Sequence, residues 1–213
     1  MSIKIALAGN PNCGKTTLFN ALTGSNQYVG NWPGVTVEKK EGKLKSKKVK
    51  EEVVVTDLPG IYSLSPYTLE EVVSRDYLLK ENPDVIVDLV DATNIERNLY
   101  LTTQLIETGV PVVIALNMAD LLEKRGIKID VARLSMLLDC PIVETSALKG
   151  EGLDKLIDEA IRTAKKKEAD LPKEIFNKDL EDAVSAAAEV LPSSIDANKK
   201  RWYAVKFLEK DSK

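Results

Sequence analysis

The sequence predicts an α/β fold in which helices cover both faces of a mostly parallel, doubly wound sheet. The runs 85–90 and 112–116 are almost entirely apolar, as expected of strands buried on both faces. Between them, residues 95–108 have helical character, and a glycine-rich turn joins the apolar run 3–8 to another helical segment. Ligands of such sheets bind beyond the carboxyl ends of the strands, so functional residues are expected at that edge.

Composition narrows the range of possible functions and sites. The 213 residues are 44% hydrophobic and 30% charged with a formal charge of -3, which indicates a globular chain and no nucleic-acid partner. The absence of histidine excludes a histidine zinc site, a Ser-His-Asp triad and a histidine base within the chain. Two cysteines give no disulfide framework and fit a reducing compartment. No apolar run approaches the ~18 to 20 residues of a membrane span, and no signal peptide is expected.

The elements follow in order along the chain. The first helix is expected to end near Thr23, and residues 25–36 lack periodicity and are predicted to form a mobile loop. A weak strand is expected from Val37 and a β-branched strand over 53–56. Residues 61–68 form a second irregular loop.

The second half of the sheet continues the alternation. Residues 69–79 are expected to be helical, and Asp130 is expected to cap a helix that runs to Leu138. The last strand is short, at 142–143, and the segment 153–164 carries a clear helical stripe. The sheet is therefore predicted to have six strands.

Past Pro172 the pattern becomes helical only, and we divide the chain into a domain of residues 1–168 and a helical part of residues 169–213. One apolar stripe comprises Phe176, Leu180, Ala183, Val184, Ala187 and Leu191, and another begins at Trp202, Val205 and Leu208. So short a segment is too small for a core of its own. It must dock on the main domain, self-associate, or belong to a bundle that is incomplete here.

The turn after the first strand fits the phosphate-loop pattern of Gly, four residues and Gly-Lys-Ser/Thr. Its residues are Gly9, Asn10, Pro11, Asn12, Cys13, Gly14, Lys15 and Thr16, and Thr17 follows. Inward-facing N–H groups and the helix start favour an anion, Lys15 would reach the outer phosphates, and the Thr16 hydroxyl would ligate magnesium. The alternative is a chance glycine turn before an ordinary helix.

The strand over 53–56 ends in Asp57-Leu58-Pro59-Gly60. A carboxylate at Asp57 is placed to hold magnesium, usually through water, and the Gly60 N–H to sense a third phosphate. Taken by itself, Asp-x-x-Gly is more often an ordinary turn at a strand end.

The stretch Asn117-Met118-Ala119-Asp120 resembles the Asn-Lys-x-Asp signature of GTP-binding proteins. An aspartate at Asp120 would accept hydrogen bonds from guanine N1 and N2, and adenine lacks that pair of donors. Met118 replaces the usual lysine, which predicts weaker and faster-exchanging guanine binding.

Thr145-Ser146-Ala147 completes the set of motifs at strand ends. The backbone N–H groups around Ser146, Ala147 and Leu148 are expected to face the guanine O6. By itself Ser-Ala carries little information, but the four spaced motifs together indicate a guanine-nucleotide site.

Taken together, the stretches 9–16, 31–38, 57–64 and 91–99 resemble the cytosolic N-terminal part of the bacterial ferrous iron transport protein B family. The resemblance implies a Ras-like P-loop GTPase domain, then a helical domain that favours the GDP state, then a membrane domain. It implies that the chain is a soluble piece of a longer protein on the cytoplasmic face of the bacterial inner membrane. Its partners would be GTP or GDP and the iron-permeation domain of the same polypeptide, with a homo-oligomer left open.

The resemblance also assigns Thr36 to the first switch, where it would ligate magnesium when GTP is bound, with Gly34 and Val35 beside the nucleotide. From the residues themselves, a threonine between two valines is more often a strand residue.

Hydrolysis needs a device other than the usual glutamine after Asp-x-x-Gly, because Ile61 occupies that position and cannot orient water. Proteins similar in this loop use the asparagine that is Asn12 here as a ligand for potassium, with carbonyls of residues 31–34 completing the shell. The catalytic set would then be Asn12, Lys15, Thr36 and Gly60, with slow turnover. The alternative for Asn12 is a turn-stabilising role.

Two functional alternatives stay open at this point. One is a potassium-dependent assembly GTPase of the ribosome or tRNA-modification type, and the other is a non-catalytic nucleotide sensor. Iron itself is not expected to bind this chain, because no ligand cluster has suitable spacing. A smaller hypothesis gives Cys13 a lowered pKa beside the phosphate nest, against the plainer interpretation of a filler position.

Overall fold

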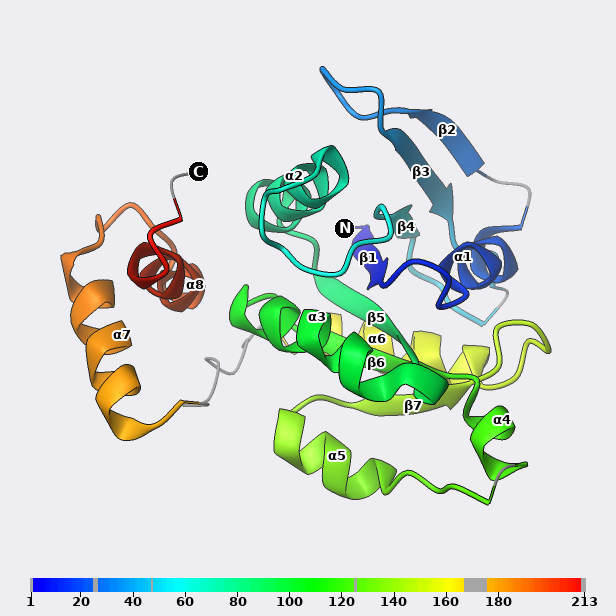
Figure 1. Cartoon of the computed structure of the whole chain (residues 1–213). Coiled ribbons are helices and arrows are strands. Elements are labelled where there is room, and N and C mark those ends of the chain that lie inside the picture. The colour runs from blue at the N-terminus through cyan, green and yellow to red at the C-terminus, as the bar shows by residue number, and fades with distance from the viewer. Residues whose placement is uncertain (1, 25–26, 47, 125, 167–175, 212–213) are drawn as a thin grey trace.

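A computed structural model describes residues 2–24, 27–46, 48–124, 126–166 and 176–211. One sheet runs in the order β2-β3-β4-β1-β5-β6-β7 (Figure 1). The strands are β1 Ile3–Gly9, β2 Gln27–Asn31, β3 Glu38–Lys43, β4 Val53–Asp57, β5 Val85–Asp91, β6 Val112–Asn117 and β7 Ile142–Thr145. Strands β4, β1, β5, β6 and β7 pair in parallel, which confirms the predicted fold class.

The expectation of six strands was one too few for the described residues. Strand β2 falls in the segment predicted to be a mobile loop, and it pairs antiparallel with β3, with Gln27 opposite Gly42 and Asn31 opposite Glu38. As an edge strand it buries little, so its sequence lacks apolar alternation and contains Gly30. Its strand conformation comes from pairing with β3, a partner that local pattern does not reveal.

Most helices lie where the sequence predicts them. They are α1 Lys15–Thr23, α2 Leu69–Asp76, α3 Ile95–Glu107, α4 Ala119–Glu123, α5 Val131–Leu138, α6 Leu153–Lys165, α7 Lys178–Val190 and α8 Ala197–Leu208, with a π-helical turn η1 Tyr77–Glu81 and a 3-10 turn η2 Ala92–Asn94. Asp130 caps α5 as predicted, since its carboxylate accepts a hydrogen bond from the Arg133 N–H. The helix predicted over 69–79 changes to π geometry at Tyr77 and ends at Glu81. Within the described part of the chain, no helix is long and apolar enough to cross a membrane.

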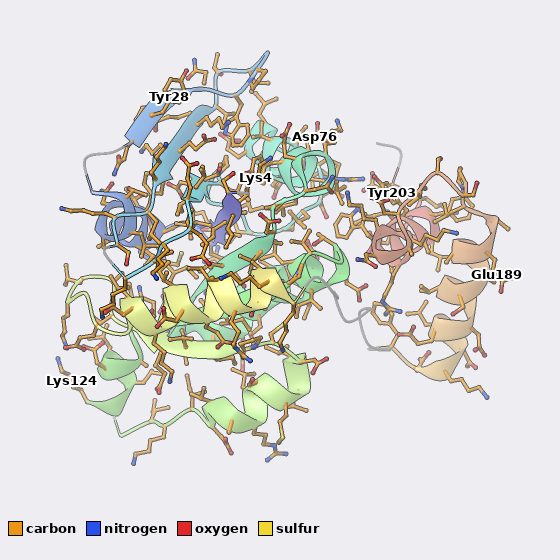
Figure 2. All side chains as sticks on the ribbon, turned by 180° about the vertical axis from the view of Figure 1, so that it is seen from behind. Lys4, Tyr28, Asp76, Lys124, Glu189 and Tyr203 are labelled. Carbon is orange, nitrogen blue, oxygen red and sulfur yellow. The ribbon has the colours of Figure 1, made fainter. Side chains whose placement is uncertain are left out.

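Two apolar layers enclose the sheet. On one face, α1 and α6 contribute Leu18, Phe19, Leu156 and Ile157 to a buried cluster. On the other face, α2, η1, α3 and α8 contribute residues such as Leu78, Leu101, Leu105 and Trp202. Figure 1 shows α3 in front of the strands and α6 behind them, and Figure 2 shows α6 crossing the strands from the opposite side. The sandwich leaves the carboxyl ends of the parallel strands open to the loops that carry the motifs.

The C-terminal helices dock on the main domain through α8. Trp202 is buried in the same cluster as the α3 leucines, and replacing such a tryptophan by alanine typically costs about 3 to 5 kcal/mol. Arg201 lies between Glu107 of α3 at 2.8 Å and Glu181 of α7 at 2.6 Å. In Figure 2, Tyr203 of α8 lies toward the main domain and Glu189 of α7 lies away from it. The predicted boundary at 168/169 lies outside the described residues.

Candidate functional site

The loop between β1 and α1 has the backbone of an anion nest. Positive φ angles occur at Gly9 (150°), Asn12 (66°) and Gly14 (98°). A Cβ atom added at Gly14 would lie 2.7 Å from the Asn117 Nδ2 atom, so no other residue fits there without displacing a buried side chain. The loop then runs directly into α1, whose first residue is Lys15. A loop with this backbone presents N–H groups to an anion, and the positive φ and close packing at Gly14 favour glycine there.

Lys15 joins the phosphate loop to the Asp-x-x-Gly motif. Its Nζ atom lies 2.5 Å from Oδ1 of Asp57 and also donates to the Leu58 carbonyl, and the Lys15 and Asp57 side chains are buried. Gly60 approaches the loop as well, since an added Cβ would lie 3.2 Å from the Pro11 Cα. The structure therefore brings these two predicted motifs together.

The remaining loop side chains divide into exposed and buried. Asn12, Thr16 and Thr17 are exposed at the mouth of the loop. The Asn10 side chain is buried, and its amide makes no hydrogen bond within the part of the chain that the structure describes. A buried amide without a hydrogen-bond partner lowers the stability of the folded state. The Asn10 position is therefore suited to a site in which a ligand atom supplies the missing hydrogen bond.

Ile61 is packed away from the loop mouth. Its side chain is buried in the cluster that contains Leu64 and Leu78, while its N–H donates to the Gly9 carbonyl at 3.3 Å. This placement agrees with the expectation that Ile61 does not orient an attacking water.

The predicted first switch is a closed turn anchored by an aromatic pair. The Trp32 N–H donates to the Val37 carbonyl at 2.9 Å, which closes the turn around Gly34, Val35 and Thr36. Thr36 is exposed and has no hydrogen bond to Thr16 or Asp57, the other two proposed magnesium ligands. The Trp32 ring meets the Tyr77 ring edge-on, with centroids 5.3 Å apart.

The sequence does not single out Tyr77, which lies within the helix predicted over 69–79. Its hydroxyl donates to the Thr56 hydroxyl at 3.0 Å, directly before Asp57 in β4. Tyr77 therefore connects the predicted first switch turn to the strand that carries the predicted magnesium carboxylate. No local pattern marks this role.

Asn117 braces the two halves of the site. Its Nδ2 atom donates to the Cys13 carbonyl at 2.9 Å, and its Oδ1 atom accepts from the Ala147 N–H at 3.1 Å. The side chain is buried. The sequence predicted Asn117 as a nucleotide contact, and the structure places it as the link between the phosphate loop and the loop after β7.

The residues predicted to read the base lie around the start of α4. Met118 adopts a left-handed conformation with φ of 63° at the N-cap, and its Cε atom lies 3.9 Å from the position of a Cβ on Gly14. The Asp120 carboxylate is paired with Lys149 at 2.7 Å, and this hydrogen bond holds the pKa of Asp120 below its ordinary value. Lys149 was not among the predicted site residues.

The loop after β7 is a tight, internally bonded turn. The Ser146 N–H donates to the Glu151 carbonyl at 3.1 Å, and the Lys149 N–H donates to the Ser146 carbonyl at 3.1 Å. Ser146 and Ala147 are buried, whereas Leu148 is 89% exposed. The predicted base-facing residues thus occupy a turn that is fixed at its base and exposed at its tip.

The hypothesis of a low-pKa thiol at Cys13 was wrong. The side chain is buried under the loop, and burial, the largest cause, raises the pKa of Cys13 to about 12. The nearby Lys15 charge lowers the pKa but does not offset burial. Cys13 is therefore expected to be a protonated and slowly reacting thiol near neutral pH.

Two family models cover most of the chain. Residues 3–160 match the model described as ferrous iron transport protein B, and residues 176–213 match the FeoB cytosolic helical domain. The chain belongs to the FeoB family. The Fe(2+) transporter FeoB of Escherichia coli strain K12 is 42% identical over 98% of the chain, which covers 27% of that relative. The Fe(2+) transport protein A/Fe(2+) transporter FeoB fusion protein of Porphyromonas gingivalis is 47% identical over 98% of the chain and 25% of that relative. The chain therefore spans about a quarter of these FeoB proteins.

Solved FeoB structures agree with the fold described above. One is a GDP-bound mutant of the S. thermophilus FeoB G-domain, which is 55% identical to the chain and has a TM-score of 0.93. The match covers 99% of the chain and 80% of the solved protein. The mGMPPNP-bound NFeoB of S. thermophilus is 55% identical over 98% of the chain and 78% of its own, with a TM-score of 0.85. A mutant of that protein bound to GDP.AlF4- is 53% identical over 99% of the chain and 80% of its own, with a TM-score of 0.85.

Proposed function

We propose that this FeoB chain binds guanine nucleotides and hydrolyses GTP, and that it regulates or drives ferrous iron uptake through a membrane domain of the same polypeptide. The observation that carries the proposal is Asn117, which holds the phosphate loop on one side and the base-facing turn on the other. One buried side chain thereby joins the phosphate loop to the turn after β7 that is proposed to face the base. The similar S. thermophilus proteins bound to GDP and GMPPNP support the same ligand class. In the longer protein the chain would lie on the cytoplasmic face of the inner membrane.

At the phosphate end, Lys15 would exchange its contact with Asp57 for phosphate oxygens. Asp57 would then be free to hold a magnesium-bound water, with the Thr16 hydroxyl as a direct ligand and Thr36 added when its turn moves toward the nucleotide. Magnesium would supply charge neutralisation on the phosphate oxygens. Hard oxygen donors of this kind suit that ion. The Gly60 N–H, beside Pro11, would sense the third phosphate.

Hydrolysis would proceed without a water-orienting side chain at Ile61, which is buried. Asn12 is exposed at the loop mouth and is proposed to hold potassium together with carbonyls of the 31–34 turn. A cation there would act on the charge that an arginine finger neutralises in other GTPases, an effect of about 10³ to 10⁵ in rate. We expect potassium to accelerate GTP hydrolysis about tenfold or more, which is part of the effect of an arginine finger.

At the base end, Asp120 would accept hydrogen bonds from guanine N1 and N2, and the Met118 thioether would pack on the base. Family membership favours this interpretation over an assembly GTPase of the ribosome or tRNA-modification type.

The test is GTP turnover by wild type and Asn12→Ala in matched potassium, rubidium, sodium and lithium salts. We expect stimulation by potassium and rubidium in wild type and its loss in Asn12→Ala. Equal hydrolysis rates in all four salts would contradict the proposed potassium site. GDP binding without any turnover would favour the interpretation as a non-catalytic nucleotide sensor. For transport, cells that express the full-length protein with Lys15→Ala should lose ferrous iron uptake, and retained uptake would contradict the coupling.

A further inference from the structure

The carboxylate proposed to read guanine already has a partner in the structure. Lys149 Nζ lies 2.7 Å from Oδ2 of Asp120, with side-chain exposures of 48% and 28%. The two residues come from different elements, Asp120 from α4 after β6 and Lys149 from the turn between β7 and α6. The ion pair therefore closes the base end of the site across two motifs.

The turn fixes where the lysine begins. The backbone of Lys149 is bonded to Ser146, the Ser146–Glu151 bridge closes the turn, and Ala147 is tied to Asn117. With its Cα held in this way, pairing orders only the Lys149 side chain, whereas a lysine on a loose surface loop would also have its backbone ordered.

Guanine and Lys149 need the same atoms. Guanine presents two donors, N1–H and the N2 amine, and a carboxylate accepts both by using its two oxygens. Lys149 engages Oδ2 of Asp120. Hypoxanthine lacks the exocyclic amine and donates through N1–H, so it needs one carboxylate oxygen and leaves the other for the lysine.

We propose that Lys149 is a specificity-determining positioning residue that competes with guanine for Asp120. Lys149 lowers the affinity for GDP more than the affinity for inosine diphosphate. It therefore reduces the ratio of the two affinities. The inference rests on the proposed guanine-nucleotide function.

Other charges near the pair supply a control. Lys124, at the C-terminal end of α4 (Figure 2), acts on Asp120 through its charge without a hydrogen bond, and Glu151 acts in the same way on Lys149. Among the causes that lower the pKa of Asp120, the Lys149 hydrogen bond is the largest. Lys124→Met therefore removes a neighbouring positive charge and leaves the pair intact.

The experiment measures dissociation constants of GDP and inosine diphosphate for wild type, Lys149→Met, Lys149→Arg and Lys124→Met. Lys149→Met should bind GDP about threefold to fivefold more tightly, the scale of a partly exposed ion pair. Its affinity for inosine diphosphate should change less than about twofold. Lys149→Arg keeps the charge and should resemble wild type, as should Lys124→Met. In about 1 M salt the difference between Lys149→Met and wild type should shrink because the pair is screened.

The sign of the change separates competition from simple structural damage, because a distorted turn would weaken GDP binding. Unchanged or weaker GDP binding by Lys149→Met would overturn the inference. So would an equal gain in Lys149→Arg, in Lys124→Met, or for inosine diphosphate. Absence of GDP binding in wild type would overturn the proposed function and this inference with it, whereas GDP binding in wild type without the predicted gain would overturn the inference alone.

Discussion

The phosphate end of the site is held by buried contacts and backbone geometry, whereas the base end is closed by exposed side chains. At the first, the Lys15 and Asp57 side chains are buried, and Gly14 leaves no room for a side chain. At the second, Asp120 and Lys149 meet at the surface. Buried groups cannot be changed without leaving a partner unsatisfied, but exposed pairs exchange with solvent and ligand at small cost. The buried and glycine positions of the phosphate end should therefore tolerate almost no substitution, whereas substitutions at the base end should change the nucleotide affinity by small amounts.

The largest effect is expected from Gly14→Ala. A Cβ at φ of 98° would be strained and would lie 2.7 Å from the Asn117 amide, so we expect nucleotide affinity to fall about a thousandfold or more. The measurement is a titration with fluorescent GDP, with folding checked by circular dichroism. Gly126→Ala is the matched control, because Gly126 has φ of 72° with no neighbouring atom within 4 Å. Near-normal GDP binding by Gly14→Ala would contradict the expectation that the phosphate end tolerates substitution less than the base end does.

The next effect concerns Asp88, in the strand that separates the phosphate-loop strand β1 from the base-motif strand β6. The carboxyl is fully buried and accepts from the Thr102 hydroxyl at 2.6 Å, and burial raises its pKa from 3.8 to about 7. Because the folded-state pKa is raised, the stability linked to this proton is present below pH 3.8 and is lost as the pH rises through about 7. Relative to Asp88→Asn, wild type should lose about 4 kcal/mol of unfolding free energy between pH 4 and pH 8. Urea unfolding of both proteins across this range is the measurement, and parallel pH profiles would contradict the prediction.

A smaller loss is expected for Asn117→Ala, which tests whether the two ends share one brace. Removing the amide leaves the Cys13 carbonyl and the Ala147 N–H without their partner, at a cost of about 1 to 3 kcal/mol even without nucleotide. Urea unfolding of the nucleotide-free protein measures it. If Asn117 only touches the nucleotide, stability without ligand will be unchanged while GDP affinity falls.

The smallest effect is expected from Met118→Lys at the base end. A lysine stem would cover the base as in the usual signature, so GDP should bind about threefold more tightly and leave more slowly. Stopped-flow release of fluorescent GDP is the measurement. Equal or weaker binding by Met118→Lys would mean that the thioether already packs on the base as well as a lysine.

The motifs and their place at strand ends were accessible from the sequence because they depend on local features. The pattern around Gly14 and Lys15 needs a turn between a strand and a helix, and both flanks show their own periodicity. The edge strand 27–31 was missed because its partner, rather than its own residues, makes it a strand. The sequence did not decide whether the C-terminal helices dock on the main domain, self-associate or belong to a larger bundle. An apolar stripe with Trp202 indicates that a surface is buried, but it does not indicate which surface covers it.

The sequence by itself predicted the alternation of strands and helices, apart from the edge strand 27–31 and helix α4. It also predicted the phosphate loop, the Asp120 motif and the lack of a water-orienting side chain at Ile61. These follow from spacing, chirality and the parallel arrangement of strands. The tertiary structure decided which distant side chains meet: Asn117 with two loops, Trp32 with Tyr77, and Lys149 with Asp120. It also decided that Cys13 is protonated, because burial outweighs the nearby lysine charge. Hydrogen bonds and ion pairs form only within a few tenths of an ångström of their preferred distance, and that proximity is set by the packed backbone as a whole.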